Sequence, residues 1–209
     1  MSSIITLDPG ASQTTIVGVN LEFVAPQGEE NIIEVTGDSP VTIFGGSVDD
    51  QITTGAGDAS IFGGDGNDSI MGGAGDDIIQ GGEGADLIRS GPGADFVFGG
   101  AGNDTIVSGL PGGSESDPIG DILSGGDGAD VFEFTQDEFE SGAVDQIVDF
   151  QADGFADFIR IFGVTDGGVS YDPETGMVSI NGQEVLDIGT GLDIDVQQQG
   201  GDSNTWELF

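Results

Sequence analysis

Apolar residues recur at every ninth position along the middle of the chain. The series consists of Ile43, Ile52, Ile61, Ile70, Ile79, Ile88, Val97 and Ile106. A period of nine matches neither the 3.6-residue turn of a helix nor the two-residue alternation of a strand. Each unit is therefore predicted to be a turn followed by a short strand with one side chain pointing inward, and stacked units form a ladder of apolar side chains.

Glycine and aspartate occupy fixed places within the same period. Residues 63–89 form three successive units of the pattern Gly-Gly-x-Gly-x-Asp-x-Ile-x. The glycines supply a bend that needs positive φ. Aspartate precedes the apolar position by two residues, and Ala59 is the one gap in this series: Asp50, Asp68, Asp77, Asp86, Asp95 and Asp104.

The period is interrupted once and then returns. Residues 125–133 form a full unit with Asp130 and Phe132, and a broken unit ends at Asp121–Ser124. The residues before it read SGLPGGSESDPIG, which is typical of a surface loop. We therefore predict a loop, at about 109–120, inserted into one unit.

The charge of the chain limits its partners. There are 39 acidic residues against two basic ones, Arg89 and Arg160, for a formal net charge of −37. Nucleic acid and anionic membranes bind basic patches, so neither is expected as a partner. No apolar stretch is long enough for a membrane span. Cations are the expected counterpart.

The residue types also limit catalysis. The chain has no His and no Cys, and it has no Lys, so zinc proteases, catalytic triads, thiol enzymes and Walker-type nucleotide sites all lack essential parts. A carboxylate pair for glycoside hydrolysis would remain possible, yet nothing distinguishes one pair among so many acids. We therefore expect no enzyme.

The aspartates carry the chemistry of the repeats. Carboxylates and turn carbonyls are hard oxygen donors, and a flexible cage of six or more oxygens suits Ca²⁺ better than Mg²⁺. Stacked aspartates would repel one another without a cation. The metal is therefore expected to be part of the fold, and the calcium-free chain to be largely disordered. The alternative is a metal-free solenoid in which each aspartate only stabilises its own turn.

This pattern resembles the RTX nonapeptide family, whose motif is Gly-Gly-x-Gly-x-Asp-x-apolar-x. The resemblance implies an all-β fold, a calcium-bound parallel β-roll. The units beginning at Gly63, Gly72, Gly81, Gly99 and Gly125 match fully, and the unit at Ser90 differs only at its first residue. The units at Gly45 and Thr54 match less well.

The resemblance also implies where calcium binds, namely between a unit and the next but one. Carbonyls of the second and fourth positions act with the Asp of one unit, and carbonyls of the first and third positions with the Asp of the other. The full set of expected ligand positions is Asp50, Gly63, Gly64, Asp65, Gly66, Asp68, Gly73, Gly75, Asp77, Gly81, Gly82, Glu83, Gly84, Asp86, Ser90, Pro92, Asp95, Gly99, Gly100, Ala101, Gly102, Asp104, Asp121, Gly125, Asp127 and Asp130.

These positions form central and outer sites. The central ones pair Asp68 with Asp86, Asp77 with Asp95 and Asp86 with Asp104; the outer ones pair Asp50 with Asp68, Asp95 with Asp121 and Asp104 with Asp130. Ala59 leaves its site without one carboxylate. We expect roughly four to six calcium ions, with affinities of about 10⁻⁴ to 10⁻³ M.

Residues 1–44 are predicted to form an N-terminal β cap. The segment TIVGVNLEF alternates Val17, Val19, Leu21 and Phe23 on one face, which predicts a single strand over residues 15–23. The segments ENIIEV and PVTIF follow at nearly the repeat spacing and are interpreted as degenerate coils. The alternative is a strand lent to a neighbouring molecule.

Residues 134–209 are predicted to form a C-terminal, sandwich-like β cap with a hairpin. Its turns are expected at Asp172–Gly176 and at Asn181–Gly182. The run Asp145, Ile147, Asp149 and Phe150, together with the terminal NTWELF, resembles the C-terminal part of proteins exported by type I secretion. This resemblance, the lack of a recognisable N-terminal signal peptide and the lack of cysteine imply a secreted, extracellular protein that meets that machinery in transit.

Three functions remain open at this stage. RTX proteins often carry a catalytic domain ahead of the roll, and the 44 residues before the repeats are too few for one. An apolar cluster is expected on one side of the roll, from Phe44, Phe62, Ile78, Phe96 and Phe98, either covered by the N-terminal strands or the inserted loop, or forming an interface. The chain is thus interpreted as a self-assembling layer, sheath, filament or extracellular matrix protein, as a monomeric calcium-dependent module that docks on surface polysaccharide, or as an accessory export domain.

Overall fold

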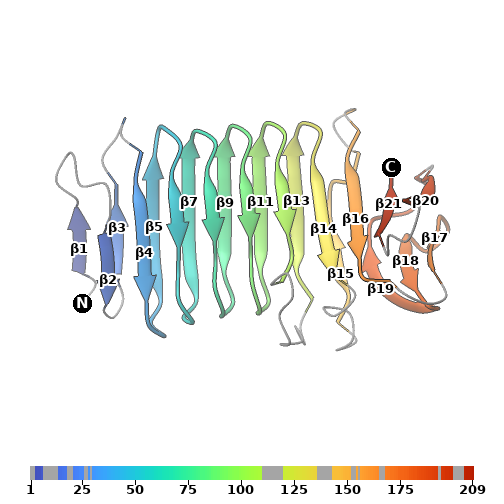
Figure 1. The fold of residues 1–209 in the computed structure, drawn as a ribbon, viewed down its shortest axis with the longest axis horizontal. Helices are drawn as coiled ribbons and strands as arrows, with labels where there is room; N and C mark the ends of the chain where they lie inside the picture. Colours follow the sequence, from blue (N-terminus) through green and yellow to red (C-terminus); the bar gives the residue numbers. More distant parts are fainter. Residues whose placement is uncertain are drawn as a thin grey trace.

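Short strands, many of them connected by short turns, stack into two sheets (Figure 1). The structure is a computed structural model. It describes residues 3–6, 14–17, 21–25, 28, 30–109, 120–135, 143–151, 154, 156–164, 168–192, 194–199 and 205–209. Within these ranges all regular structure is β, and no helix long and apolar enough to cross a membrane occurs.

Odd-numbered strands build most of the first sheet, which has 11 strands. Its spatial order is β1 (Ser3–Thr6), β3 (Leu21–Val24), β5 (Val41–Gly46), β7 (Ala59–Asp65), β9 (Ile78–Glu83), β11 (Phe96–Ala101), β13 (Ile122–Asp127), β15 (Asp145–Ile147), β19 (Gln183–Asp187), β18 (Met177–Ile180) and β17 (Val169–Asp172).

Even-numbered strands build most of the second sheet, which has 10 strands. Its order is β2 (Thr14–Val17), β4 (Ile32–Thr36), β6 (Gln51–Thr53), β8 (Ser69–Met71), β10 (Leu87–Arg89), β12 (Thr105–Val107), β14 (Val131–Thr135), β16 (Phe158–Phe162), β21 (Thr205–Leu208) and β20 (Val196–Gln198). From β1 to β16, successive strands alternate between the sheets and pair in parallel with the strand one coil away, which confirms the predicted parallel β-roll.

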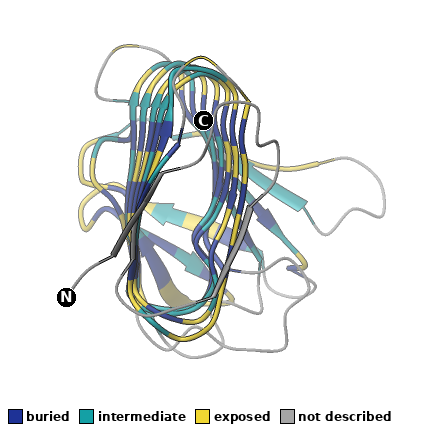
Figure 2. Ribbon diagram, turned by 90° about the vertical axis from the view of Figure 1, so that its left-hand side faces the viewer, coloured by how far each residue is buried: buried dark blue, intermediate teal, exposed yellow. Residues whose placement is uncertain are grey.

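The core lies between the two sheets. Seen along the roll, the buried residues line the inside of a flattened tube (Figure 2). In the first sheet Ile43, Ile61, Ile79, Val97 and Leu123 face one another in register. In the second sheet the matching row is Ile33, Ile52, Ile70, Ile88, Ile106, Phe132 and Ile159. Each of these side chains is at most 1% exposed. The nine-residue apolar period therefore divides into two ladders, one on each sheet.

The inserted loop changes the spacing of one coil without breaking the stack. Asp95 and Asp121 are joined by a hydrogen bond across 26 residues, whereas the preceding coils are joined across 18. Strand β13 still pairs with β11 in register. Residues 110–119 lie outside the described part of the chain. An insertion is tolerated here because the turns lie at the edge of the roll, away from the rows of apolar side chains between the two sheets.

The N-terminal strands continue the roll. β1 pairs with β3 and β2 pairs with β4, all in parallel. The single strand predicted over residues 15–23 is wrong, because β2 and β3 lie in different sheets. Apolar and polar residues alternate over residues 15–23 as they would in one long strand, but the chain passes from one sheet to the other within this segment. The segments ENIIEV and PVTIF supply β4 and β5, as coils without a complete acidic turn.

The parallel stack ends in antiparallel strands. β17, β18 and β19 form a meander whose turns contain Pro173–Gly176 and Asn181–Gly182, as the sequence predicted. β21 runs antiparallel to β16 and places Leu208 in the core with 0% exposure. Arg160 on β16 forms ion pairs with Glu133 on β14 and Glu207 on β21, at 3.4 and 3.1 Å. The C-terminal segment is therefore an integral strand of this fold.

The predicted apolar cluster lies on the outer face of the first sheet. Ile78, Phe96 and Phe98 are 41–47% exposed, and the rings of Phe44 and Phe62 stack with centroids 5.0 Å apart. β1 and β3 extend this sheet at its end, so they do not cover the cluster. The possible cover by the inserted loop concerns residues outside the described part. We call these five residues the aromatic face.

Candidate metal centre

Aspartates form a continuous ladder along one edge of the roll, which we call edge 1. It contains the turns after β5, β7, β9, β11 and β13, at the top of Figure 1. The backbone N–H of each aspartate donates to Oδ1 of the aspartate one coil further on, at 2.7 to 3.0 Å. The members are Asp50, Asp68, Asp86, Asp104, Asp130 and Asp157.

A second ladder runs along the opposite edge, edge 2, which contains the turns after β6, β8, β10 and β12. The same bond joins Ala59, Asp77, Asp95, Asp121 and Asp145 at 2.7 to 2.9 Å. Ala59 donates its N–H to Asp77 but offers no carboxylate of its own. Each aspartate at the sixth position of the repeat thus belongs to one of two rows on opposite edges. Neighbouring members of a row are one coil apart.

The second oxygen of the edge-1 aspartates has a different environment. Oδ2 of Asp50, Asp68, Asp86 and Asp104, like Oδ2 of Asp77 on edge 2, is buried and has no hydrogen-bond partner within the described residues. The residues themselves are at most 3% exposed. A buried carboxylate oxygen without a partner is costly, so each of these atoms is suited to accept a cation.

The glycine at the first position of a unit leaves room beside that oxygen. A Cβ built on Gly63 would collide with Asp68 Oδ2 and would lie 2.6 Å from the carbonyl oxygen of Gly81. The arrangement repeats at Gly81 with Asp86 and at Gly99 with Asp104. The carboxylate and a carbonyl of the next coil therefore converge on one space that the missing side chain keeps open.

Burial makes these carboxylates hard to ionise without a cation. Desolvation raises the pKa of Asp68 and of Asp104 from 3.8 to about 7, partly offset by the backbone N–H that each accepts, and neighbouring aspartates raise it further. Desolvation likewise raises the pKa of Asp77 to about 8. The pKa values of Asp50 and Asp86 are raised for the same first reason. A bound cation would reverse this effect.

The donor set fits calcium. Within the described residues no group of three His, Cys, Asp or Glu side chains could hold a metal, so a site must combine single carboxylates with backbone carbonyls. Those are oxygen donors only, at flexible turns, which suits Ca²⁺ and disfavours zinc and other metals that prefer nitrogen or sulfur.

The structure places the other predicted ligand positions at the same edges. Glycines at the second and fourth positions have positive φ: Gly64, Gly66, Gly73, Gly75, Gly82, Gly84, Gly100 and Gly102. Third-position carbonyls accept backbone bonds, from Gly66 to Glu83, from Gly84 to Ala101, from Gly102 to Asp127 and from Gly75 to Pro92, at 2.7 to 3.0 Å. Each such carbonyl keeps its second lone pair for a cation.

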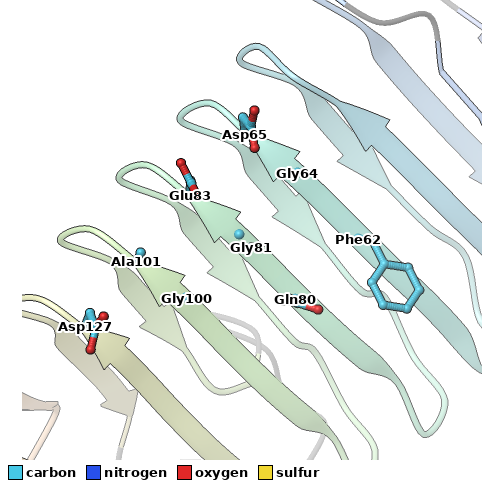
Figure 3. A pocket seen from close by; sticks show the side chains of 10 residues that line it. Phe62, Gly64, Asp65, Gln80, Gly81, Glu83, Gly100, Ala101 and Asp127 are labelled. Atoms are coloured by element: carbon cyan, nitrogen blue, oxygen red, sulfur yellow. The ribbon is translucent and has the colours of Figure 1, made fainter.

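Third-position side chains point outward. Figure 3 shows Asp65, Glu83 and Asp127 in a row at the ends of β7, β9 and β13, beside a surface depression that Phe62 and Gln80 also line. It is the backbone carbonyls of Glu83 and Asp127, and not their carboxylates, that bond to the neighbouring coil.

Several residues at the edges were missed by the sequence analysis. Asn31 donates its backbone N–H and its side-chain amide to Asp50 Oδ1, so it begins the edge-1 ladder. Asp157 ends that ladder, and Asp145 ends the other. The motif containing Asp145 and Ile147 could have indicated one more coil, because it keeps the two-residue spacing between Asp and the apolar position.

Fifth-position residues form a further, exposed ladder. Asp49 accepts from Asn67, and Asn67 from Ala85, at 2.7 and 2.8 Å. On edge 2, Asp58 accepts from Asp76 at 3.1 Å. This use of Asx side chains was not predicted, although the frequent Asn and Asp beside the main aspartate were its signal.

Comparison with protein families agrees with this geometry. The profile of the RTX calcium-binding nonapeptide repeat, in four copies, matches residues 44–79, 71–106 and 120–134. These parts of the chain therefore carry RTX calcium-binding repeats. RTX repeats bind calcium, so the two aspartate ladders belong to a calcium-binding roll. The matched RTX segments contain no catalytic domain, and neither the search of curated proteins nor the search of solved structures returned a significant match.

Proposed function

We propose that this RTX protein is secreted and folds on extracellular calcium, and that it then serves a structural, non-enzymatic role at the cell surface or in the extracellular matrix. The observation that supports the proposal best is the row of buried Oδ2 atoms of Asp50, Asp68, Asp86 and Asp104 on edge 1, which have no hydrogen-bond partner among the residues that the structure describes. Two carboxylates about 5 Å apart repel by about 3 kcal/mol at an effective dielectric constant of about 20. A row of them therefore favours the folded roll only when cations lie between its members.

The ligands we propose are those of the central sites, with Asp68, Asp86 and Asp104 supplying carboxylate and the glycine-rich turns supplying carbonyls. Calcium would neutralise charge and join one coil to the next. The ion count of roughly four to six is part of this proposal. Export would precede folding, because cytosolic calcium is too low to fill sites of millimolar affinity.

Size-exclusion chromatography with light scattering tests the calcium coupling. Chelated protein should behave as an expanded chain, with a radius of gyration near 50 Å, and addition of calcium to about 1 mM should move it towards the roughly 17 Å of a compact chain of this length. An unchanged, compact molecule in both conditions would refute the proposal.

A pair of variants tests whether calcium binds at the aspartates of edge 1. Asp86→Asn removes a buried carboxylate of the ladder, whereas Asp65→Asn removes an exposed, outward one. We expect Asp86→Asn to raise the calcium concentration at the folding midpoint about tenfold or more, equivalent to about 1.4 kcal/mol, and Asp65→Asn to leave it nearly unchanged. Equal effects of the two would argue against ordered sites on the ladder.

The aromatic face supports self-assembly within this role. Four of its members are at least 36% exposed on one sheet face, and contiguous exposed apolar patches usually mark contacts. The same light-scattering experiment distinguishes the outcomes. Large regular particles in calcium favour a layer, sheath or filament, while a compact monomer favours the second candidate, a monomeric module that docks on surface polysaccharide or accompanies an exported enzyme.

A further inference from the structure

The two edges of the roll differ at the first position of the repeat. On edge 1 this position is always glycine: Gly45, Gly63, Gly81, Gly99 and Gly125. On edge 2 it is Thr54, Gly72, Ser90 and Ser108. The motif resemblance treats both edges alike, so this difference concerns this chain in particular.

Backbone conformation does not explain the first-position glycines. None of them has a φ in the left-handed region, in contrast with the glycines at the second and fourth positions. Any residue could adopt their conformation. What excludes a side chain is space, because a Cβ on Gly81 would collide with Asp86 Oδ2 and lie 2.6 Å from the carbonyl oxygen of Gly99. The glycine therefore preserves the space in which carboxylate and carbonyl converge.

On edge 2, Ser108 fills the equivalent space. Its hydroxyl donates to Oδ2 of Asp121, the aspartate of its own unit, at 2.7 Å. Both residues are buried, with 2% and 1% exposure. The hydroxyl of Ser90 lies 3.5 Å from the same oxygen. The oxygen that remains without a partner beside Gly63, Gly81 and Gly99 is thus hydrogen-bonded here.

Thr54 donates its hydroxyl to a carbonyl oxygen, in the unit that has no aspartate. Its own unit carries Ala59 in place of aspartate. The Thr54 hydroxyl donates to the carbonyl oxygen of Gly72 and lies 3.3 Å from that of Met71. Gly72 O is the first-position carbonyl of the next coil, the atom type that converges with Oδ2 on edge 1. Loss of the carboxylate and gain of a hydroxyl donor occur in one unit.

Gly72 is the exception on edge 2. A Cβ there would lie 2.6 Å from Asp77 Oδ2 and 2.5 Å from the carbonyl oxygen of Ser90. Asp77 Oδ2 has no hydrogen-bond partner within the described residues. This one unit of edge 2 therefore keeps the open arrangement of edge 1.

We propose that the first residue of a unit controls whether its turn binds calcium: glycine leaves a cation site, whereas a serine or threonine whose hydroxyl donates to the converging carboxylate or carbonyl oxygen, as Ser108 and Thr54 do, closes it. Calcium then loads the glycine-led units, namely those of edge 1 and the unit of Asp77 on edge 2. The oxygens beside Thr54 and Ser108 are held by hydrogen bonds and need no metal. The inference rests on the calcium binding proposed above and specifies its distribution.

Metal analysis after equilibrium dialysis at saturating calcium tests this distribution by counting ions per chain. Ser108→Gly should bind one more ion than the parent, because it exposes Asp121 Oδ2. Gly81→Ser should bind at least one fewer. The double variant Thr54→Gly with Ala59→Asp should also gain one, and Ser69→Gly, an exposed position on β8, should match the parent.

The outcomes separate this inference from the proposed function. A parent chain that binds no calcium refutes the proposed function and the inference together. A parent that binds calcium, with an unchanged count in both opening variants, refutes the inference alone. Loss of an ion in Ser108→Gly would also overturn it, because the hydroxyl would then be a ligand. Circular dichroism at saturating calcium confirms that each variant is folded, and the opening variants keep the test decisive if Gly81→Ser does not fold.

Discussion

At the scale of single residues, each edge-1 aspartate divides its carboxylate between two tasks. Oδ1 accepts the N–H of the preceding coil and sets the spacing between coils, while Oδ2 faces the space beside a glycine. The first task favours a charged acceptor, and the second makes charge costly unless a cation is present. The same side chain therefore specifies the fold and makes it depend on metal.

This division predicts an unusual pH dependence for the calcium-free roll. The pKa values of Asp68, Asp77, Asp104 and Asp121 rise from 3.8 to about 7, 8, 7 and 9. Between pH 4 and those values the folded chain holds protons that the unfolded chain has lost, so its stability falls as pH rises. Circular dichroism of the protein in chelator should therefore show a larger folded fraction at pH 5.5 than at pH 8.

Calcium should reverse that trend, because protons compete with the cation for the same oxygens. Calcium-saturated protein is expected to be at least as stable at pH 8 as at pH 5.5. A larger folded fraction of the chelated protein at pH 8 than at pH 5.5 would contradict the assignment of these carboxylates as buried and costly to ionise.

At the scale of strands, a three-residue element contributes one inward side chain and little else. β8 and β10 bury Ile70 and Ile88 and expose or half-expose their neighbours. Such strands are too short to be stable alone. Their stability comes from pairing with the matching strand one coil away, so the row of inward side chains acts as a single core.

Neighbouring isoleucines on β9 allow a matched test of this core. Ile79 is 0% exposed and Ile78 is 47% exposed. Ile79→Ala should lower the free energy of unfolding in calcium by about 2–5 kcal/mol. Ile78→Ala, on the aromatic face, should change it by no more than about 0.5 kcal/mol. Chemical denaturation measures both, and similar losses would show that the face is covered in solution.

The last coil needs a cap because β15 is shorter than β13. Asp149 supplies one, accepting from the backbone N–H of Gly125 and Gly126 at 3.1 and 2.9 Å and from the hydroxyl of Ser124. Phe150 is buried against Phe132, with ring centroids 6.3 Å apart. The segment that resembles an export-linked motif thus also closes the roll.

Removal of this cap should destabilise the C-terminal end. Asp149→Ala leaves two backbone N–H groups without their acceptor, which costs about 1–3 kcal/mol per buried group. Glu184→Ala, at an exposed position of β19, is the control and should have little effect. Hydrogen exchange in calcium should show faster exchange at Gly125 and Gly126 in Asp149→Ala. Unchanged exchange there would exclude the capping role.

At the scale of the whole molecule, the sequence predicted the stacked coils of the repeats but not the structure where the repeats are interrupted or end. The apolar period fixed the stack because every unit repeats the same spacing. The switch of sheets between β2 and β3 was hidden, since the residues there lack the Gly-Gly-x-Gly-x-Asp motif that marks a turn elsewhere. Ser108 was overlooked because the insertion separates it from Asp121. The ion pairs of Arg160 depend on β21 returning to β16, a contact that no local pattern records.

The 18-residue coil also governs how such a chain can grow or shrink over generations. Loss of residues 64–81 removes one full turn of the roll and keeps every later unit on its own edge. Loss of residues 64–72 removes half a turn, so later glycine-led units and hydroxyl-led units exchange edges. We expect the longer deletion to keep calcium-dependent folding, measured by circular dichroism, at a lower calcium midpoint than the shorter one. Repeats of this roll would then be gained or lost in even numbers during evolution. Gain or loss of a single unit would place glycine-led and hydroxyl-led units on the same edge.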